Sequence, residues 1–340
     1  MARVVTFGEI MLRLSTTGYR RIVQAETFDV NYGGGEANVA CSLANYGSDA
    51  AFISAVPDNP LGQAAINHLR RYGVDTAHVR RSGERLGIYF LETGAAQRAS
   101  TVTYDRGHAS ICDVQPGEFD WTDIFSGADW FHVTGITPAL GDGPAQTTLE
   151  AARVAKSLGL TVSCDLNFRS KLWSSEEANR VMTELMHYTD VVIANEEDAA
   201  KVFGIHAAES NVTRGRLDQD GYREAARQLV ERFDLRMAAI TLRESLSASD
   251  NVWSALLDDG DECAFSRSYP VHIVDRVGGG DAFAAGLIQA LVTGHSATAS
   301  LEFATAASCL KHTIPGDFNH VSLMEVMSLV GGDGSGRVQR

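Results

Sequence analysis

The stretch that decides the fold is Val-Asp-Arg-Val-Gly-Gly-Gly-Asp-Ala-Phe-Ala-Ala-Gly-Leu, residues 274–287. A β-like run at 271–274 leads into it, and helix-forming residues follow Gly278, Gly279 and Gly280. Glycine lets the main chain adopt positive φ and approach a ligand closely, and the first amides of a helix have no partner within it. With the positive end of the helix dipole beside them, these amides are predicted to bind phosphate.

Asp281 lies at the mouth of this predicted phosphate site, where its carboxylate can either cap the helix or accept a proton. A second glycine cluster, Gly-Gly-Gly-Glu-Ala-Asn at 33–38, also leads into helix-like sequence. Two common phosphate motifs do not fit. A P-loop has Gly-Lys-Ser/Thr where this chain has Gly280 and Asp281. The dinucleotide fingerprint needs a third glycine where Phe283 and Asn38 stand.

Length and composition fit a globular protein with either one large α/β domain or a core plus a small accessory part. The 340 residues are 44% hydrophobic and 21% charged, with a net charge of −14. This charge argues against nucleic-acid binding, which requires clustered Lys and Arg. The five cysteines form no Cys-x-x-Cys pair, so neither a disulfide framework nor a zinc site is indicated. Without a signal peptide or a long apolar run, we expect no membrane association and a cytoplasmic location.

The alternation of strand and helix patterns predicts a mostly parallel central sheet with helices on both faces. Expected strands lie at 4–7, 50–56, 130–133, 160–165, 191–194 and 237–242, and expected helices at 36–46, 61–72, 146–157, 175–187 and 222–233. Ligands of such sheets bind at the carboxyl ends of the strands.

Three short strands without a helix between them, at 79–81, 86–92 and 100–104, do not fit this alternation. We expect them to form a small β-lid, built from about 19–33 and 79–107, on a domain spanning 1–330. Leu86, Ile88 and Phe90 would share one apolar face, which predicts a homo-oligomer through the lid. The glycine-rich end, 331–340, is predicted to be a flexible tail.

Together, the segment at 33–38 and the segment Asp-Arg-Val-Gly-Gly-Gly-Asp at 275–281 resemble the two signatures of ribokinase-like carbohydrate kinases. The resemblance covers nearly the whole chain. The segments at 104–107, 165–169 and 311–319 are most similar to the 2-keto-3-deoxygluconate kinases of that family. It implies a ribokinase-like fold and transfer of the ATP γ-phosphoryl group to a sugar hydroxyl. Asp281 would be the general base, and the amides of Gly278, Gly279 and Gly280 would form the anion hole.

The same resemblance implies a pocket for an anionic sugar acid. Its residues would be Gly34, Asn38, Tyr89, Tyr104, Arg106, Ile136, Arg169, Asp281 and Asp317. Arg106 and Arg169 are of most interest, because a guanidinium can hold a carboxylate with two parallel hydrogen bonds. The alternative for each arginine is an ordinary surface salt bridge.

For the nucleotide, the resemblance implies contacts from a further set of residues. These are Asn167, Arg169, Asn195, Thr241, Arg243, Ser245, Ser247, Gly278 and Gly280. Mg²⁺ would lie near Asn195 and Asp198, and a monovalent cation is also compatible with the family. Aspartate replaces the final glutamate of the family's Asn-x-x-Glu element, so we expect contact with the metal through water.

Two departures from the family pattern concern the nucleotide side: residues 243–249 contain no glycine, and Arg276 stands where many relatives have a small hydroxyl residue. Arg276 would pair either with an anionic ligand or with an acidic neighbour. Two alternatives to a sugar-acid kinase also stay open at this point. One is the same chemistry on a neutral sugar such as fructose or ribose, and the other is a sugar-binding regulator without turnover.

Overall fold

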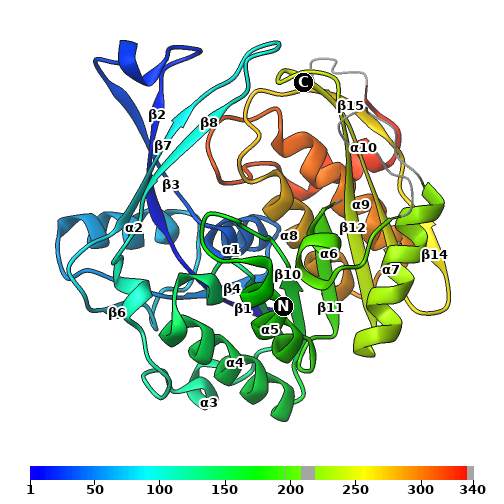
Figure 1. The fold of residues 1–340 in the computed structure, drawn as a ribbon, viewed down its shortest axis with the longest axis horizontal. Helices are drawn as coiled ribbons and strands as arrows, with labels where there is room; N and C mark the ends of the chain where they lie inside the picture. Colours follow the sequence, from blue (N-terminus) through cyan, green and yellow to red (C-terminus); the bar gives the residue numbers. More distant parts are fainter. Residues whose placement is uncertain (196, 208–218, 335–340) are drawn as a thin grey trace.

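A nine-stranded sheet forms the body of the computed structural model, which describes residues 1–195, 197–207 and 219–334 (Figure 1). The strand order is β14-β13-β12-β11-β10-β9-β1-β4, with β15 paired to β13. From β4 to β12 all neighbours are parallel, and beyond β12 they are antiparallel. The strands are β1 (Arg3–Phe7), β4 (Asp49–Ile53), β9 (Trp130–Thr134), β10 (Thr161–Asp165), β11 (Val191–Asn195), β12 (Met237–Ser245), β13 (Asp250–Asp258), β14 (Cys263–Phe265) and β15 (Tyr269–His272).

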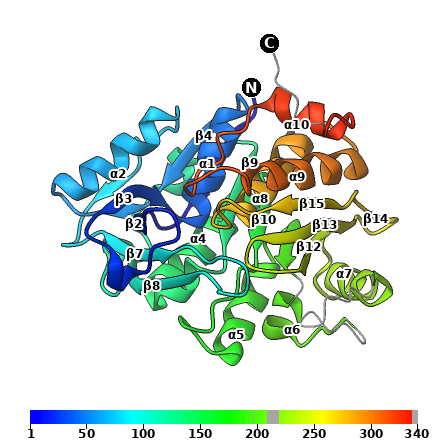
Figure 2. The same cartoon turned by 90° about the horizontal axis from the view of Figure 1, so that it is seen from above.

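Helices cover both faces of this sheet, as Figure 2 shows from above. They are α1 (Gly35–Asn45), α2 (Pro60–Arg71), α3 (Trp121–Ile124), α4 (Asp142–Ser157), α5 (Ser175–Met186), α6 (Asp198–Phe203), α7 (Gln219–Phe233), α8 (Gly279–Val292), α9 (Ala297–Lys311) and α10 (Leu323–Val330). Short 3₁₀ turns occur at Ile22–Gln24, Ser110–Asp113 and Pro138–Leu140. The α/β class and the mostly parallel sheet expected from the sequence are confirmed.

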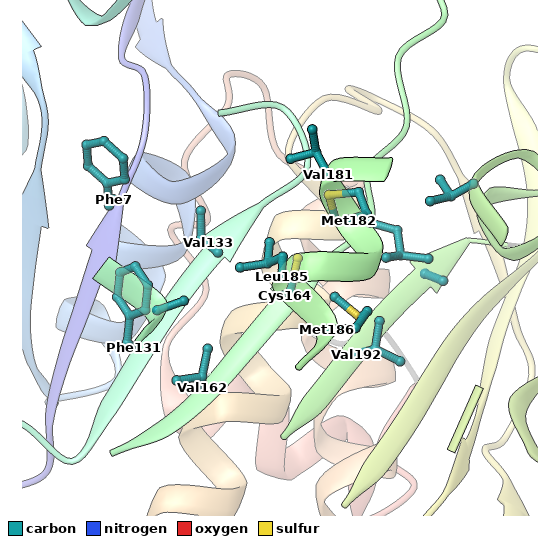
Figure 3. Packing of buried hydrophobic residues seen from close by; sticks show 14 of the residues in the cluster. Phe7, Phe131, Val133, Val162, Cys164, Val181, Met182, Leu185, Met186 and Val192 are labelled. Atoms are coloured by element: carbon teal, nitrogen blue, oxygen red, sulfur yellow. The ribbon is translucent and has the colours of Figure 1, made fainter. Parts of the chain in front are cut away.

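Buried apolar residues form one core on each side of the sheet. Val5 and Phe7 of β1 belong to the core that includes residues of α4, α5 and α7, whereas Val4 belongs to the core on the opposite face with residues of α1, α8 and α9. Figure 3 shows α5 lying over β9, β10 and β11, with Met182 and Leu185 directed at the sheet. Both faces of these strands are buried, which explains their continuous apolar sequences.

Several helix starts have a local cause in the sequence. The side chain of Asn59 accepts hydrogen bonds from the amides of Leu61 and Gly62, and Pro60 suits the first position of α2. At α5, Ser174 and Glu177 form a capping box. Such caps satisfy amides that have no partner inside the helix.

The lid is a separate four-stranded sheet of order β3-β2-β7-β8, which stands off the body (Figure 1). Its strands are β2 (Met11–Thr16), β3 (Phe28–Gly33), β7 (Gly87–Glu92) and β8 (Thr101–Asp105). The sequence did not indicate that residues 11–16 belong to the lid. It also assigned 79–81 there incorrectly, because β6 (Arg80–Arg81) pairs with β5 (Ala55–Val56) in a two-stranded sheet. The amide of Arg80 donates to the carbonyl of Ser54, which ties this segment to the body.

The strand expected at 271–274 is confirmed at Val271 and His272 but does not continue to Val274. β15 ends at His272 and pairs antiparallel with β13, so no parallel strand precedes the glycines. The amides of Val274 and Asp275 instead both donate to the carbonyl of His312, at 2.8 and 3.2 Å. An irregular segment held by the end of α9 therefore leads into α8.

The C-terminal segment lies only partly within the structure: of the tail predicted at 331–340, residues 335–340 lie outside the described residues. In the part of the chain that the structure describes, no helix combines the length and apolarity needed to cross a bilayer.

Candidate active site

A cavity of about 400 Å³ lies at the carboxyl ends of the parallel strands, between the lid and the start of α8. Its wall brings together nearly all of the site residues expected from the sequence. These are Gly34, Asn38, Tyr89, Tyr104, Arg106, Ile136, Asn167, Arg169, Asn195, Asp198, Thr241, Arg243, Gly278, Gly279, Gly280, Asp281 and Asp317. The segments that carry them are far apart in the sequence and meet only in the fold.

Ser245 and Ser247, expected to contact the nucleotide, do not line this cavity. β12 continues to Ser245, which pairs with Asn251 of β13 in a hairpin. The hydroxyl of Ser247 accepts the amides of Ser249 and Asp250 at 3.0 and 2.9 Å. The glycine-free segment 243–249 therefore runs from the end of β12 into the turn of a β-hairpin, where the hydroxyl of Ser247 is used in the turn itself.

The predicted anion hole is built from the main chain at the start of α8. Gly278 precedes the helix with φ of 85°, a conformation that favours glycine. A Cβ atom at Gly278 would lie 2.1 Å from the carbonyl oxygen of Asp317, and one at Gly279 would lie 2.5 Å from the ring of His312. At Gly280 a Cβ would meet no atom within 4 Å. Two of the three glycines are thus required by close packing, and the third adjoins open space.

Asp281 lies where the N-termini of α1 and α8 meet. Its Oδ2 accepts a hydrogen bond from Nδ2 of Asn38 at 2.6 Å, and Oδ1 of Asn38 accepts the amide of Gly34 at 3.3 Å. Burial raises the pKa of Asp281 to about 6, against the opposing effects of the Asn38 hydrogen bond and the Arg169 charge. A carboxylate with this pKa is ionised near neutral pH and still basic enough for proton abstraction.

Further carboxylates, Asp165 and Asp198, line the cavity beside Asp281. Burial and the charges of Asp198 and Asp281 hold the pKa of Asp165 well above its ordinary value, while Arg169 opposes this rise. The two oxygens of Asp198 accept the amides of Phe168 and of Asn195, at 3.3 and 3.2 Å. Asp198 therefore joins the ends of β10 and β11 as well as facing the cavity.

This group of oxygen donors fits Mg²⁺, which prefers carboxylate, phosphate and water ligands. Like charges that raise one another's pKa are relieved by a bound cation. Among residues 1–195, 197–207 and 219–334, no three His, Cys, Asp or Glu side chains are arranged to hold a metal by themselves. The ion would accordingly depend on phosphates and water as well as on Asn195 and Asp198.

On the lid side, Arg106 forms a buried ion pair with Glu9. Its guanidinium also lies 5.2 Å from the ring centre of Tyr104. Arg106 is thus not the surface salt bridge that the sequence left open. Sequence reasoning missed Glu9, although its place directly after the buried strand β1 is where ligand-binding residues gather in such sheets.

Tyr89 and Asp317, both expected to face the sugar, contact each other. The hydroxyl of Tyr89 donates a short hydrogen bond to Oδ1 of Asp317, and both side chains are almost fully buried. Burial and the Asp317 charge hold the pKa of Tyr89 well above its ordinary value, so the phenol stays the donor. The pair closes the lid side of the cavity near Gly278.

The nucleotide side contains cavity residues that the sequence did not single out, His312 and Trp253. The two rings lie 4.8 Å apart, and Nδ1 of His312 lies 2.7 Å from the carbonyl of Ser308. Burial lowers the pKa of His312 to about 4, so the ring is neutral and Nδ1 is the donor. Arg276 also lines this wall, and its Nη2 donates to Oδ1 of Asn251 at 3.2 Å.

Comparison with known proteins agrees with the resemblance to carbohydrate kinases over nearly the whole chain. The family model described as pfkB family carbohydrate kinase matches residues 1–320. The chain is 34% identical to a 2-dehydro-3-deoxygalactonokinase of Haloferax volcanii, over 98% of each chain. It is 27% identical to a 2-dehydro-3-deoxygluconokinase of Bacillus subtilis, over 95% of this chain and 94% of the other.

Among solved structures, a 2-dehydro-3-deoxygluconokinase from Thermotoga maritima is 49% identical, with a TM-score of 0.94. The match covers 98% of this chain and all of the other. A structure from Enterococcus faecalis described as a 2-keto-3-deoxygluconate kinase has a TM-score of 0.91 at 26% identity, over 100% of this chain and 99% of the other. Family model, relatives and structures agree with the geometry of the cavity: the chain belongs to the pfkB family of carbohydrate kinases and has its ribokinase-like fold.

Proposed function

We propose that this kinase transfers the γ-phosphoryl group of ATP to the 6-hydroxyl of 2-keto-3-deoxygluconate, the same compound as 2-dehydro-3-deoxygluconate, to give 2-keto-3-deoxy-6-phosphogluconate. The single observation that carries the proposal is the Asp281 carboxylate at the mouth of the α8 N-terminus, held by Asn38 inside one cavity. The substrate choice draws on the names of the Thermotoga maritima and Bacillus subtilis relatives.

In this reaction Asp281 accepts the proton of the sugar 6-hydroxyl, and the hydroxyl oxygen attacks the γ-phosphorus of ATP. The bond between that phosphorus and the bridging oxygen then breaks, and ADP leaves with the electron pair. The amides at Gly278, Gly279 and Gly280 hold the transferring group, where a lost donor typically costs about 2.7–4 kcal/mol. Positioning and charge neutralisation are most of what phosphoryl transfer requires from a protein.

We expect the remaining nucleotide contacts on the wall between β10, β12 and α8. Asn167, Arg169, Asn195, Thr241 and Arg243 line it and are suited to the phosphates and ribose of ATP. Mg²⁺, when bound near Asn195 and Asp198, would neutralise negative charge on the phosphate oxygens.

For the acceptor, two arginines line the cavity in a chain that is strongly acidic overall. Arg106 is oriented by Glu9, and Arg169 lies close enough to Asp281, Asp165 and Asp198 to affect their pKa values. Guanidinium groups in these positions can hydrogen-bond and neutralise a substrate carboxylate. A neutral sugar would have no negative group to offer them, which favours a sugar acid over fructose or ribose.

An ATP-coupled assay tests the proposal, with 2-keto-3-deoxygluconate, 2-keto-3-deoxygalactonate, fructose and ribose as acceptors. The galactonate is included because of the Haloferax volcanii relative. We expect Mg²⁺-dependent turnover with a keto-deoxy acid and a much lower kcat/KM with either neutral sugar. A higher kcat/KM for fructose or ribose would overturn the substrate assignment and leave the family assignment intact.

The lid-mediated homo-oligomer, the cytoplasmic location and use of a monovalent cation stay predictions. Size-exclusion chromatography with light scattering measures the first, and the same coupled assay in potassium, sodium and tetramethylammonium buffers measures the last. We expect a dimer or larger oligomer, since the outer face of the lid carries half-buried Ile88 and Phe90 and the exposed Val30.

A further inference from the structure

A buried group of charges joins the lid to the loop that forms the anion hole. Arg13 of β2 has a side chain that is only 3% exposed, and its guanidinium bridges two carboxylates. Nη1 donates to Asp317 at 2.6 Å, Nη2 donates to Asp275 at 2.5 Å, and Nε donates to Oγ of Ser15 at 2.6 Å. Every nitrogen of the guanidinium therefore has an acceptor. Arg13 does not line the cavity and so has no place in the substrate contacts described above.

The first of these carboxylates, Asp275, determines the path of the main chain into the anion hole. Its Oδ1 accepts the amide of Val277 at 3.1 Å, one residue before Gly278. Its Oδ2 accepts the amide of Gly316 at 2.9 Å together with Nη2 of Arg13. Asp275 thus ties three segments together directly beside the start of α8.

The second carboxylate, Asp317, contacts the lid with its side chain and the anion hole with its backbone. The carboxylate lies against Gly33 of β3, where a Cβ would come within 2.1 Å, and accepts the hydroxyl of Tyr89 on β7. Its carbonyl oxygen lies against Gly278 equally closely. With Arg13 on β2, three of the four lid strands touch this one residue.

A fully buried lysine, Lys311, completes the charge balance, with its ammonium donating to the carbonyl of Ile314 at 3.2 Å. Burial lowers the pKa of Lys311, and the charges of Asp275 and Asp317 oppose this shift and favour the ionised form. Two cations thus face two carboxylates out of water. Buried ion pairs add little net stability over apolar packing, but their geometry is specific, and a planar guanidinium holds two carboxylates at fixed angles as an ammonium cannot.

We propose that Arg13 is a positioning residue for phosphoryl transfer. It holds the loop that leads into Gly278, Gly279 and Gly280 at a fixed position relative to the lid strands that carry the acceptor pocket. The inference rests on the proposed role of the Gly278, Gly279 and Gly280 amides. Through Asp275 and Asp317, Arg13 sets where those amides lie relative to Tyr89 and the sugar. Misplacement of reacting groups by about 1 Å is enough to cost about 100-fold in rate.

The test compares Arg13→Lys with wild type and with the control Arg21→Lys. Arg21 is also a lid arginine in an ion pair, with Glu92, but its side chain is 59% exposed and does not line the cavity. We expect Arg13→Lys to fold, to keep the KM values for ATP and sugar near wild type, and to lose about 100-fold in kcat. Arg21→Lys should keep both kcat and the KM values of the wild type. A purely structural Arg13 would lower the melting temperature and leave the kcat of the folded enzyme unchanged, which would overturn the inference.

A milder variant, Ser15→Ala, keeps the inference testable if Arg13→Lys does not fold. It removes only the acceptor of Nε, so we expect a smaller loss of kcat at unchanged KM, and wild-type kcat would count against the positioning role. Wild-type enzyme is assayed with every acceptor in parallel. If the wild-type enzyme does not phosphorylate the sugar acid, the proposed substrate is wrong. The kcat of Arg13→Lys is then compared with wild type on the acceptor that the enzyme does phosphorylate.

Discussion

The two ends of the cavity are built in different ways. At the proposed phosphate end the candidate binding groups are main-chain amides of consecutive residues, Gly278, Gly279 and Gly280. At the acceptor end they are side chains paired across the fold, such as Arg106 with Glu9 and Tyr89 with Asp317. The first end is therefore sensitive to the space around its glycines, and the second to the chemistry of single side chains.

The largest effect is expected where the two ends meet. Asp281→Asn removes the proposed base but keeps the size of the side chain and a partner for Asn38. We expect kcat to fall by about 100-fold to 10,000-fold, with ATP still bound. Steady-state kinetics and calorimetric titration of the nucleotide measure the two quantities. A kcat near that of wild type would remove Asp281 from the chemistry.

Glycine substitutions test whether the phosphate end depends on main-chain placement. Gly278→Ala forces a Cβ to within 2.1 Å of the Asp317 carbonyl oxygen at a φ of 85°, so the loop must move. We expect kcat to fall by roughly 100-fold to 1,000-fold, the effect of losing an oxyanion donor. Gly294→Ala, just after α8 and outside the cavity, is the matched control, because its φ is 83° and its Cβ would meet no atom within 4 Å. Equal losses in the two variants would contradict a steric requirement specific to Gly278.

At the acceptor end, Arg169→Ala should act on substrate affinity. A hydrogen bond to a charged group contributes about 1.5–3 kcal/mol, so the KM for a sugar acid should rise roughly 10-fold to 150-fold. A neutral sugar tested alongside should show little change. Arg223→Ala, on the exposed side of α7, is the control for loss of a surface arginine. An unchanged KM for the acid would mean that Arg169 does not bind its carboxylate.

The smallest effect is a pH dependence that we assign to Asp281. Its pKa is raised to about 6, and the proposed base must be ionised in order to accept a proton. Activity is thus present above about pH 6, and kcat/KM should fall about tenfold per pH unit below it. The pH profile of kcat/KM with the sugar acid measures this pKa in the free enzyme. An acid limb centred near the ordinary aspartate pKa would show that burial does not tune this group.

The same contrast explains what the sequence could predict. The start of α8 and its glycines are a local pattern, and the structure has them where the sequence indicated. Strand–helix alternation likewise predicted the parallel strands from β4 to β12. Of the strand expected at 271–274, Val271 and His272 lie in β15, whereas the amide of Val274 donates to the carbonyl of His312, a partner distant in the sequence.

Pairs of distant residues were the part that the sequence could not reveal. Glu9 and Arg13 lie in an apolar strand pattern near the N-terminus, and nothing local shows that their partners are Arg106, Asp275 and Asp317. The lid strand β2 was missed for the same reason, since its pairing with β3 and β7 depends on tertiary contact. A resemblance to a known family supplied most cavity residues, but not the contacts between them.

The most direct test of the account is a crystal structure of the protein with Mg²⁺, a non-hydrolysable ATP analogue and 2-keto-3-deoxygluconate. We expect the terminal phosphate on the amides at Gly278, Gly279 and Gly280, with the Asp281 carboxylate within hydrogen-bond distance of the 6-hydroxyl. A terminal phosphate bound elsewhere in the cavity, with Asp281 directed away from the sugar, would contradict the account.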